Sequence, residues 1–396
     1  MVEHHQHLAF MQRALELARR AEGRTSPNPM VGAVIVNDGR IVGEGYHRRA
    51  GAPHAEIEAL HAAGEAARGG IMYVTLEPCA HYGRTPPCTD ALIAAGIAEV
   101  YYAISDPNPK VSGKGHAQLV AAGLRVHQGL CAAEAHQLNR PYLKHITTGY
   151  PFVTAKFAMS LDGKIATNTG HSRWISNAAS RQRVHQLRNL SDAILVGSGT
   201  VIADDPLLTT RLVSTATDAD SDIRHPLRII VDSRGRVPLT ARVFDPSLPG
   251  TTVLATTAQC PEDYRHELAA RGVEMWILPT EATGRVSLPD LLAAVGQRGL
   301  LTVLVEGGSE LLGALFSQRL VDRVLACIAP IIIGGRNAPG PVGGTGWSHL
   351  NEVARLCQYT CTRVVDETAE TADNEPDVWI QADVTYPEGA SCLPVL

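Results

Sequence analysis

The spacing of hydrophobic residues changes several times along the first 150 positions, and each change predicts an element. Apolar residues three and four apart predict helices, and short β-rich runs bounded by Gly, Pro, Asn or Asp predict strands. The pattern predicts helices at 8–22, 56–64, 89–96, 114–123 and 133–149, a hairpin at 31–47, and strands at 71–76, 99–105 and 124–130. Strands that alternate with helices from residue 71 onward indicate an α/β layered domain.

The second half of the chain has apolar strand runs with helix patterns between several of them. The runs begin at residues 151, 192, 227, 251, 273, 301 and 323, with a helix over 172–191 and a final edge strand at 377–386. Near-continuous apolar strands with helices between them imply a sheet that is covered on both faces. The polar stretch 213–222 predicts a loop. Gly149 and Pro151 interrupt the pattern, which divides the chain into domains 1–147 and 148–396.

One stretch of the first half carries a metal-ligand pattern. His54, Cys79 and Cys88 offer one imidazole and two thiols. This is the donor set of a tetrahedral zinc site with three protein ligands and one open position. Glu56 is not needed as a ligand, and a carboxylate beside an open zinc position is suited to moving protons to and from water. An H-x-E pattern followed by Pro-Cys and a second Cys is the zinc deaminase signature.

The predicted elements place these candidate ligands at the ends of helices and strands. His54 and Cys88 each precede a predicted helix, and Cys79 follows a predicted strand. The partial positive charge at a helix start favours a thiolate. A structural zinc site is the alternative, with His81 as a fourth ligand, but such a site has no use for Glu56.

A pair of glycines marks the candidate anion site of the second half. Gly307 and Gly308 follow a strand, and a helix pattern begins at Ser309. Backbone N–H groups at such a helix start bind phosphate or pyrophosphate. A tight strand–helix turn without a ligand fits the motif as well. The Gly-Ser-Gly-Thr at 197–200 lacks the third glycine of a dinucleotide fingerprint and is a weak signal.

Composition narrows the classes of function. The chain has 396 residues, 45% of them hydrophobic, so each half is able to bury a core. With 35 basic and 40 acidic residues the net charge is −5, which argues against a broad nucleic-acid or membrane surface. Of eight cysteines only Cys79 and Cys88 have a metal-like context, which indicates a reduced, cytoplasmic protein. We find neither a signal peptide pattern nor a run of 18 apolar residues.

The first half resembles a known family. PNPMVGAVIV, GEGYHRRAGAPHAEIEAL, YVTLEPCAHYGRTPPC and DPNP are similar to the deaminase domain of the bifunctional deaminase/reductase of riboflavin biosynthesis. Most zinc deaminases space their cysteines as C-x-x-C, whereas eight residues separate Cys79 from Cys88 here, as in this family. The resemblance implies a cytidine-deaminase-like, three-layer fold that binds Zn²⁺.

Two loop residues near this zinc segment are candidates for substrate contact. We interpret Asn28 as a contact to the substrate ring, and His81 is a weaker candidate of the same kind. The alternative for both is a polar side chain that satisfies a turn.

Segments of the second half resemble the reductase domain of the same family. SLDGKIA, SRWIS, VGSGTVIADDPLLTTR and VEGGSELLGALF carry this resemblance, which implies a dihydrofolate-reductase-like fold and the use of NADPH. The resemblance implies cofactor contacts at Ala158, Trp174, Thr200, Asp204, Gly308, Ser309, Glu310, Leu311, Leu312, Gly313 and Ala314. It implies substrate contacts at Ser172, Arg188, Leu208, Arg211 and Glu306. Arg188 and Arg211 are suited to pair with a substrate phosphate.

These interpretations combine into one hypothesis, a cytoplasmic enzyme with two activities. The first domain hydrolytically deaminates 2,5-diamino-6-(5-phosphoribosylamino)pyrimidin-4-one. The second uses NADPH to reduce the ribosyl group, which yields 5-amino-6-(5-phosphoribitylamino)uracil. The proton donor for reduction is not evident, since Asp204 is either that donor or a cofactor contact. The expected partners are this small molecule and further copies of the chain in a homo-oligomer, and neither nucleic acid nor a membrane.

Two other interpretations stay open on the sequence. A transfer-RNA or nucleoside deaminase with an unrelated accessory domain would show a basic stripe, and the net charge of −5 argues against it. A non-catalytic zinc-binding module would bind the metal without a role for Glu56 in ammonia release.

Overall fold

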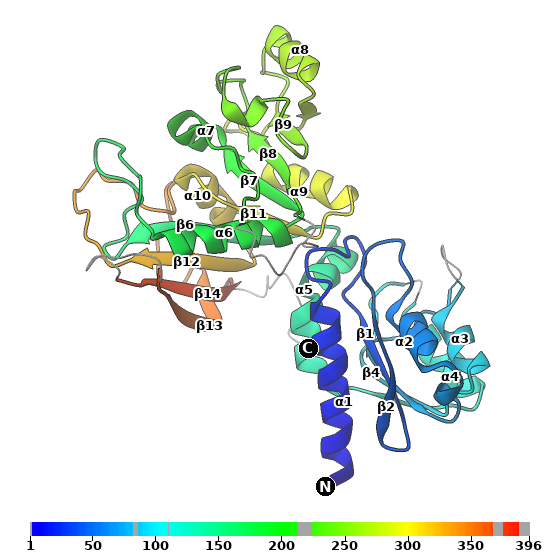
Figure 1. Cartoon of the computed structure of the whole chain (residues 1–396). Coiled ribbons are helices and arrows are strands. Elements are labelled where there is room, and N and C mark those ends of the chain that lie inside the picture. The colour runs from blue at the N-terminus through cyan, green and yellow to red at the C-terminus, as the bar shows by residue number, and fades with distance from the viewer. Residues whose placement is uncertain (1, 82–85, 110, 213–222, 367–374, 388–396) are drawn as a thin grey trace. The chain divides into compact units, whose positions relative to one another are not determined.

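The computed structural model describes residues 2–81, 86–109, 111–212, 223–366 and 375–387 (Figure 1). The chain divides into two compact units, Met1–Gly149 and Tyr150–Leu396. The expected boundary at 147/148 falls in the last turn of helix α5, which ends at Thr148 and is capped by Gly149 in the left-handed conformation. The predicted loop at 213–222 lies outside the described residues.

The first unit is built on a five-stranded sheet in the order β2-β1-β3-β4-β5. Its strands are β1 (Gly32–Asn37), β2 (Arg40–Tyr46), β3 (Ile71–Leu76), β4 (Glu99–Ile104) and β5 (Arg125–Gln128). Strand β1 is antiparallel to β2 and β3, and β3, β4 and β5 run parallel. The predicted hairpin is confirmed, and Asp38 and Gly39 turn it with φ angles of 49° and 74°.

Helices cover both faces of this sheet, which confirms the expected three layers. Helices α1 (Val2–Arg19) and α5 (Ala132–Thr148) lie on one face, and α2 (Ala55–Ala63), α3 (Cys88–Ala94) and α4 (Lys114–Ala121) lie on the other (Figure 1). A short 3-10 helix, η1, spans Gly64–Ala67. Helix α1 begins earlier than the prediction of 8–22 and ends at Arg19, before a turn that contains Gly23.

The second unit contains a nine-stranded sheet in the order β10-β9-β8-β7-β11-β6-β12-β14-β13. Its strands are β6 (Phe152–Ser160), β7 (Ala193–Gly197), β8 (Leu227–Val231), β9 (Thr252–Thr256), β10 (Glu274–Ile277), β11 (Thr302–Val305), β12 (Arg323–Ala329), β13 (Arg355–Val364) and β14 (Asp377–Thr385). Neighbours are parallel except that β14 is antiparallel to both β12 and β13.

The prediction that 377–386 forms an edge strand is wrong. Strand β14 lies inside the sheet because β13 pairs along its outer side. Most side chains of β13 are exposed, so its sequence has no hydrophobic alternation that would predict a strand.

Helices also cover both faces of the larger sheet, as the apolar strands predicted. Helices α9 (Leu288–Gln297) and α10 (Ser309–Ser317) pack on one face, where Val295 and Leu312 join the core of the central strands. Helices α6 (Ala178–Leu190), α7 (Ser198–Asp204) and α8 (Glu262–Ala270) pack on the other, beside a 3-10 helix η2 (Arg242–Phe244). Among the helices of the described ranges, none has the length and hydrophobicity to cross a bilayer.

The start of α6 differs from the prediction of a helix over 172–191. Residues 173–176 are turns and bends, and the helix begins at Ala178. The Asn177 side chain caps it by accepting a hydrogen bond from the Ser180 N–H at 2.8 Å. Residues 172–176 therefore lie outside the helix, and they line a cavity of the second unit.

Candidate active sites

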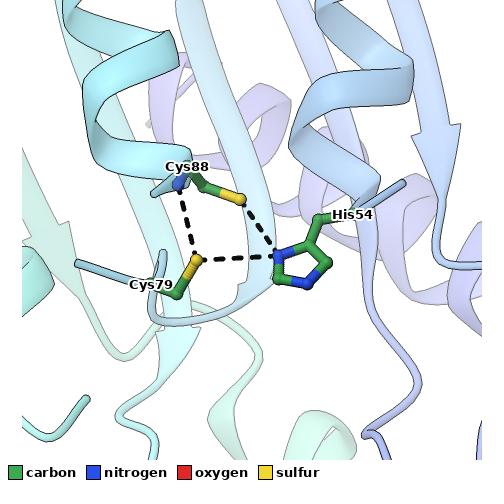
Figure 2. A group of neighbouring side chains, drawn as sticks. All are labelled: His54, Cys79 and Cys88. Atoms are coloured by element: carbon green, nitrogen blue, oxygen red, sulfur yellow. Dashed lines mark hydrogen bonds between the residues drawn. The ribbon is translucent and has the colours of Figure 1, made fainter. Parts of the chain in front are cut away.

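Three potential metal ligands meet between two helix starts of the first unit. Figure 2 shows His54 at the start of α2, Cys88 at the start of α3, and Cys79 in the loop after β3. The His54 Nδ1 atom lies 3.2 Å from the Cys88 sulfur and 3.6 Å from the Cys79 sulfur. Tetrahedral zinc with ordinary Zn–N and Zn–S lengths places nitrogen and sulfur roughly 3.5 Å apart. The three donors therefore fit a zinc ion.

Close packing of glycines against backbone positions these ligand-bearing segments. A Cβ atom on Gly45 would lie 2.5 Å from the Ala55 carbonyl oxygen, so only glycine lets α2 lie this close to β2. A Cβ atom on Gly115 would lie 2.0 Å from the Pro78 carbonyl oxygen, which brings α4 against the loop of Cys79. The Glu77 carboxylate accepts two N–H groups near the start of α4 and holds the same loop.

The two cysteines are coupled to each other. The Cys88 N–H donates to the Cys79 sulfur at 3.4 Å, and the Thr89 N–H donates to the Cys79 carbonyl oxygen at 3.2 Å. Hydrogen bonding from the Cys88 thiol lowers the pKa of Cys79 to about 4, and the same bond together with burial raises the pKa of Cys88. Both sulfurs would have to be thiolates to hold a metal ion, because thiols ligate metals in that form.

Glu56 lies beside the ligands without joining them. It is in the first turn of α2, is 4% exposed and lines the adjoining cavity. Burial raises the pKa of its carboxyl group against the attraction of His54. Within the described part of the chain the group of potential ligands consists of His54, Cys79 and Cys88. His81 lines the cavity but is not in that group, so the alternative of a closed four-ligand site has no support here.

A cavity of about 330 Å³ opens beside the cluster, and it contains the predicted Asn28. The Asn28 amide nitrogen lies 3.0 Å from Nε2 of the buried His47, whose Nδ1 lies 3.0 Å from the Pro53 carbonyl oxygen. The His47 ring meets the His54 ring edge-on at 5.6 Å. The sequence interpretation did not single out His47, although it lies in the GEGYHRRAGAPHAEIEAL segment that carries the resemblance.

Asp106 is a second residue of this cavity that the sequence interpretation missed. The Tyr142 hydroxyl donates to its carboxylate at 2.9 Å, and burial raises the pKa of that carboxyl group. Strands β3 and β4 are parallel, so their carboxyl ends lie at the same end of the sheet. A polar residue after β4 should therefore lie near Cys79, which follows β3, and this rule identifies Asp106.

Two adjoining cavities of about 820 and 780 Å³ lie where β7 and β11 end in the second unit. They share Ser172, Thr200, Asp204, Gly308 and Ser309. The first also contains the predicted Ala158, Trp174, Arg188, Leu208, Arg211, Glu306 and Leu312, and the second contains Glu310, Leu311 and Ala314. Gly313 lines neither cavity, because it packs against the Gly343 backbone, where a Cβ atom would lie 2.2 Å from the carbonyl oxygen.

A nearly buried ion pair forms the floor of the first cavity. Arg188 donates from Nε and Nη2 to the two Glu306 oxygens, both at 2.7 Å, and from Nη1 to the Thr209 carbonyl at 3.0 Å. Burial raises the pKa of the Glu306 carboxyl group, but the attraction and hydrogen bonds of Arg188, together with the charges of Lys156 and His185, hold that pKa below its usual value. All three guanidinium nitrogens of Arg188 thus donate hydrogen bonds within the protein. The pairing of Arg188 with a substrate phosphate therefore stays a prediction.

Lys156 and His185 line the same cavity and were missed from the sequence. Burial lowers the pKa of Lys156, against the attraction of Glu306. The backbone N–H of Arg211 donates to His185 Nδ1 at 3.2 Å. Burial, Arg188 and Arg211 lower the pKa of His185 to about 4, so its ring is neutral at pH 7. Spacing could have found both: Lys156 is two residues before Ala158 on β6, and His185 is three before Arg188 on α6.

The glycine pair after β11 begins a helix, as predicted. Helix α10 starts at Ser309, and the φ angle of 116° at Gly307 is one that only glycine adopts readily. A Cβ atom on Gly308 would lie 3.0 Å from the Thr200 hydroxyl oxygen, so a larger residue there would crowd Thr200. The first N–H groups of a helix have no partner within it, and here they border both cavities.

Comparisons with known families agree with these two sites. Residues 4–104 match the family model described as the cytidine and deoxycytidylate deaminase zinc-binding region. Residues 151–365 match the family model of the RibD C-terminal domain. The two expected fold classes are thereby confirmed.

Similar proteins cover most of the chain. Riboflavin biosynthesis protein RibD of Bacillus amyloliquefaciens is 42% identical over 351 residues, which are 89% of this chain and 91% of the relative. The RibD protein of Escherichia coli is 45% identical over 330 residues, 82% of this chain and 88% of the relative. A solved structure of Acinetobacter baumannii RibD has a TM-score of 0.82 at 38% identity and covers 96% of this chain and 99% of that chain.

Proposed function

Since this chain belongs to the RibD family of riboflavin biosynthesis proteins, we propose residue roles for its two activities. The protein is a zinc-dependent deaminase and an NADPH-dependent reductase of riboflavin biosynthesis. The deaminase acts on the diaminopyrimidine that carries a phosphoribosylamino group, and the reductase converts the ribosyl group of the resulting uracil to a ribityl group. The observation that carries the assignment is a three-donor metal cluster beside a buried Glu56 in one unit, and a buried Arg188–Glu306 pair in the other.

In the deaminase, His54, Cys79 and Cys88 would hold the zinc ion, which when bound lowers the pKa of a water molecule to roughly 7. Glu56 would accept a proton from the attacking water and deliver it to the departing amino group. Its buried position supports this role, because a raised pKa brings the carboxyl closer to the operating pH. Asn28 would hold the pyrimidine ring from the cavity wall.

In the reductase, NADPH when bound supplies the hydride for C1 of the ribosyl group. Ala158, Trp174, Thr200, Asp204 and the start of α10 would hold it, and Ser172, Leu208 and Arg211 would hold the substrate. His185 Nδ1 accepts the backbone N–H of Arg211 and holds the chain there, and the Arg211 guanidinium, which is suited to the phosphate, donates to the Thr209 hydroxyl oxygen at 3.2 Å.

Proton transfer in the reductase is best assigned to the buried charges of the first cavity. As the hydride joins C1, the bond from C1 to the ring oxygen breaks, and that oxygen takes up a proton. Lys156 is suited to give it, because burial lowers its pKa and Glu306 lies beside it. Arg188 positions Glu306 by its two parallel hydrogen bonds. Asp204, which accepts a hydrogen bond from Ser172 where the cavities join, then remains a cofactor contact.

Metal removal tests the assignment of the two activities to separate sites. We expect a chelator to abolish ammonia release from the diaminopyrimidine substrate and added Zn²⁺ to restore it. NADPH oxidation with the deaminated intermediate should continue in the same chelated sample, since the predicted metal ligands all lie in the first unit. Deamination that persists without bound metal would contradict the zinc assignment, and a lack of NADPH oxidation would contradict the reductase assignment.

We also propose that the chain forms a homo-oligomer through strand β13. Within the described residues β13 pairs only with β14, and it exposes 51% of Leu356 and 72% of Tyr359. A long edge strand with exposed apolar side chains is a template for pairing with another chain. A cytoplasmic location, expected from composition, remains a prediction.

Size measurement tests the proposed oligomer. Light scattering on the intact protein should give a multiple of 42.3 kDa, and Tyr359→Lys should shift it toward the single chain. Val120→Lys is the control, because Val120 is 50% exposed on α4 of the other unit. A wild-type mass of one chain, or an assembly that Tyr359→Lys leaves intact, would contradict the role of β13.

A further inference from the structure

We infer that Thr89 and Gln118 are positioning residues of the zinc site, which hold Cys79 in place for the metal through a chain of hydrogen bonds. The inference rests on the proposed zinc-dependent deaminase function of the first unit. Among the described residues, neither belongs to the group of potential ligands, and neither lines the cavity beside that group. Both therefore act through Cys79 and not on the substrate.

Cys79 is the ligand that needs support from outside its own segment. His54 and Cys88 lie at the starts of α2 and α3, so the helices fix their backbone. Cys79 instead lies in the loop after β3, a strand that ends at Leu76. A ligand in such a loop keeps its orientation through hydrogen bonds from the residues around it, and these outer bonds tune metal affinity.

The first turn of α3 makes three contacts with Cys79. The Cys88 N–H donates to the Cys79 sulfur at 3.4 Å (Figure 2). The Thr89 N–H donates to the Cys79 carbonyl oxygen at 3.2 Å, and the Thr89 hydroxyl oxygen also lies 3.2 Å from it. Thr89 is fully buried, so these contacts are shielded from water. The turn that carries Cys88 thus also holds the second sulfur ligand.

Gln118 of α4 connects the Thr89 hydroxyl group to a carboxylate. The hydroxyl donates to Gln118 Oε1 at 2.9 Å, and Gln118 Nε2 donates to the Asp90 carboxylate at 2.6 Å. An ionised carboxylate only accepts, so Asp90 selects the amide nitrogen and turns the amide oxygen toward Thr89. The single hydroxyl hydrogen is then shared between this oxygen and the Cys79 carbonyl oxygen.

Helix α4 has a fixed place beside the ligand loop. A Cβ atom on Gly115 would lie 2.0 Å from the Pro78 carbonyl oxygen, so the helix packs directly on the residue before Cys79. The Glu77 carboxylate accepts two backbone N–H groups near the start of α4, at 3.1 and 3.2 Å. Gln118 therefore reaches the Thr89 hydroxyl from an element that is already anchored to the loop it supports.

The consequence is a pair of sulfur ligands whose positions are set before the metal arrives. Hydrogen bonds that orient metal ligands typically change metal affinity 10- to 100-fold when they are removed. A hydroxyl that merely joined α3 to α4 would change the stability of the fold and leave zinc affinity alone. Thr89 differs from such a link because its N–H and its hydroxyl both meet the carbonyl oxygen of a ligand residue.

The test is the dissociation constant of Zn²⁺ for the full chain, measured by competition with a chromophoric chelator. Thr89→Val keeps the branched shape and removes the hydroxyl, so it should raise the constant about 10- to 100-fold. Gln118→Leu should act in the same direction, and Thr89→Ser, which keeps the hydroxyl, should stay near the wild type. Thr75→Val is the matched control, since the Thr75 hydroxyl is equally buried in the first unit but accepts the Gly32 N–H at 3.2 Å.

A second measurement uses Co²⁺ in place of zinc, because its visible absorption depends on the geometry of the ligands. Thr89→Val should change this spectrum and Thr75→Val should not. Excess Zn²⁺ should restore ammonia release by Thr89→Val, since Thr89 does not line the substrate cavity.

The outcomes separate this inference from the proposed function. If the wild type binds no zinc, the zinc assignment itself fails. If the wild type binds zinc and both Thr89→Val and Gln118→Leu match it, the positioning role is wrong and the zinc assignment stands. Equal losses of zinc affinity in Thr75→Val and Thr89→Val would also overturn the inference, because the cause would then be general destabilisation. If Thr89→Val does not fold, the comparison of Thr89→Ser with Gln118→Leu decides.

Discussion

Replacing Glu56 with Gln should reduce ammonia release by about 10²- to 10⁴-fold, the usual contribution of a positioned acid–base group. Gln fills the same volume in the buried first turn of α2, but its amide does not take up a proton from water. Zinc content should stay at the wild-type level, because the three donor atoms come from His54, Cys79 and Cys88. Ammonia release and elemental analysis of the same sample measure the two quantities.

The reductase reaction of the Glu56→Gln protein is its internal control. NADPH oxidation with the deaminated intermediate should be unchanged, since Glu56 belongs to the other compact unit. Deamination near the wild-type rate would remove the acid–base role from Glu56. Loss of zinc would instead make Glu56 a ligand or a structural support of the cluster.

Replacing Glu306 with Gln should abolish most reductase activity and lower the free energy of unfolding of the second unit by about 3–5 kcal/mol. The reason is that Arg188, with a side chain only 11% exposed, would keep its charge without a carboxylate partner. The four tryptophans, Trp174, Trp276, Trp347 and Trp379, all lie in the second unit, so their fluorescence during urea unfolding follows that unit alone.

An exposed ion pair provides the matched control for Glu306→Gln. Glu274 pairs with Arg298 at 2.7 Å, but the two side chains are 39% and 43% exposed. Glu274→Gln should therefore cost less than about 1 kcal/mol and leave both activities in place. The double variant Arg188→Met with Glu306→Leu should recover stability without recovering reduction. Equal destabilisation by Glu274→Gln and Glu306→Gln, or reduction by the double variant, would contradict this account of the buried pair.

The clustering of the three candidate zinc ligands was predictable because their positions depend on local signals. His54 and Cys88 lie where a helix pattern begins, and Cys79 lies where a strand ends, and the structure has helices and a strand with those ends. The reductase residues were reached through the resemblance, and all of them except Gly313 line the two joined cavities. Their individual roles remain proposals.

The residues that were missed depend on contacts between distant segments. Lys156, which was missed, and Glu306, which was predicted, are 150 positions apart. They meet because β6 and β11 pair in parallel, with Ala155 beside Val305. Asp106 reaches the zinc cavity because β4 lies next to β3. Asp106 lies in the DPNP segment and Lys156 is two residues from Ala158, but only the order of the strands brings each of them to its cavity. The wrong assignment of β14 to the edge has the same cause.

The amino-acid sequence by itself determined most elements of both sheets, though not β13, and the helix starts that carry His54 and Cys88. It also predicted a division of the chain at 147/148, close to Gly149, where the first compact unit ends. These depend on periodicity, turn residues and capping, which act over a few neighbouring positions. Only the tertiary structure decided which charged groups lie together: Arg188 against Glu306, and Asp106 inside the cavity beside the metal-ligand cluster. The reason is that burial and pairing of charge depend on the packing of segments that are far apart in the chain.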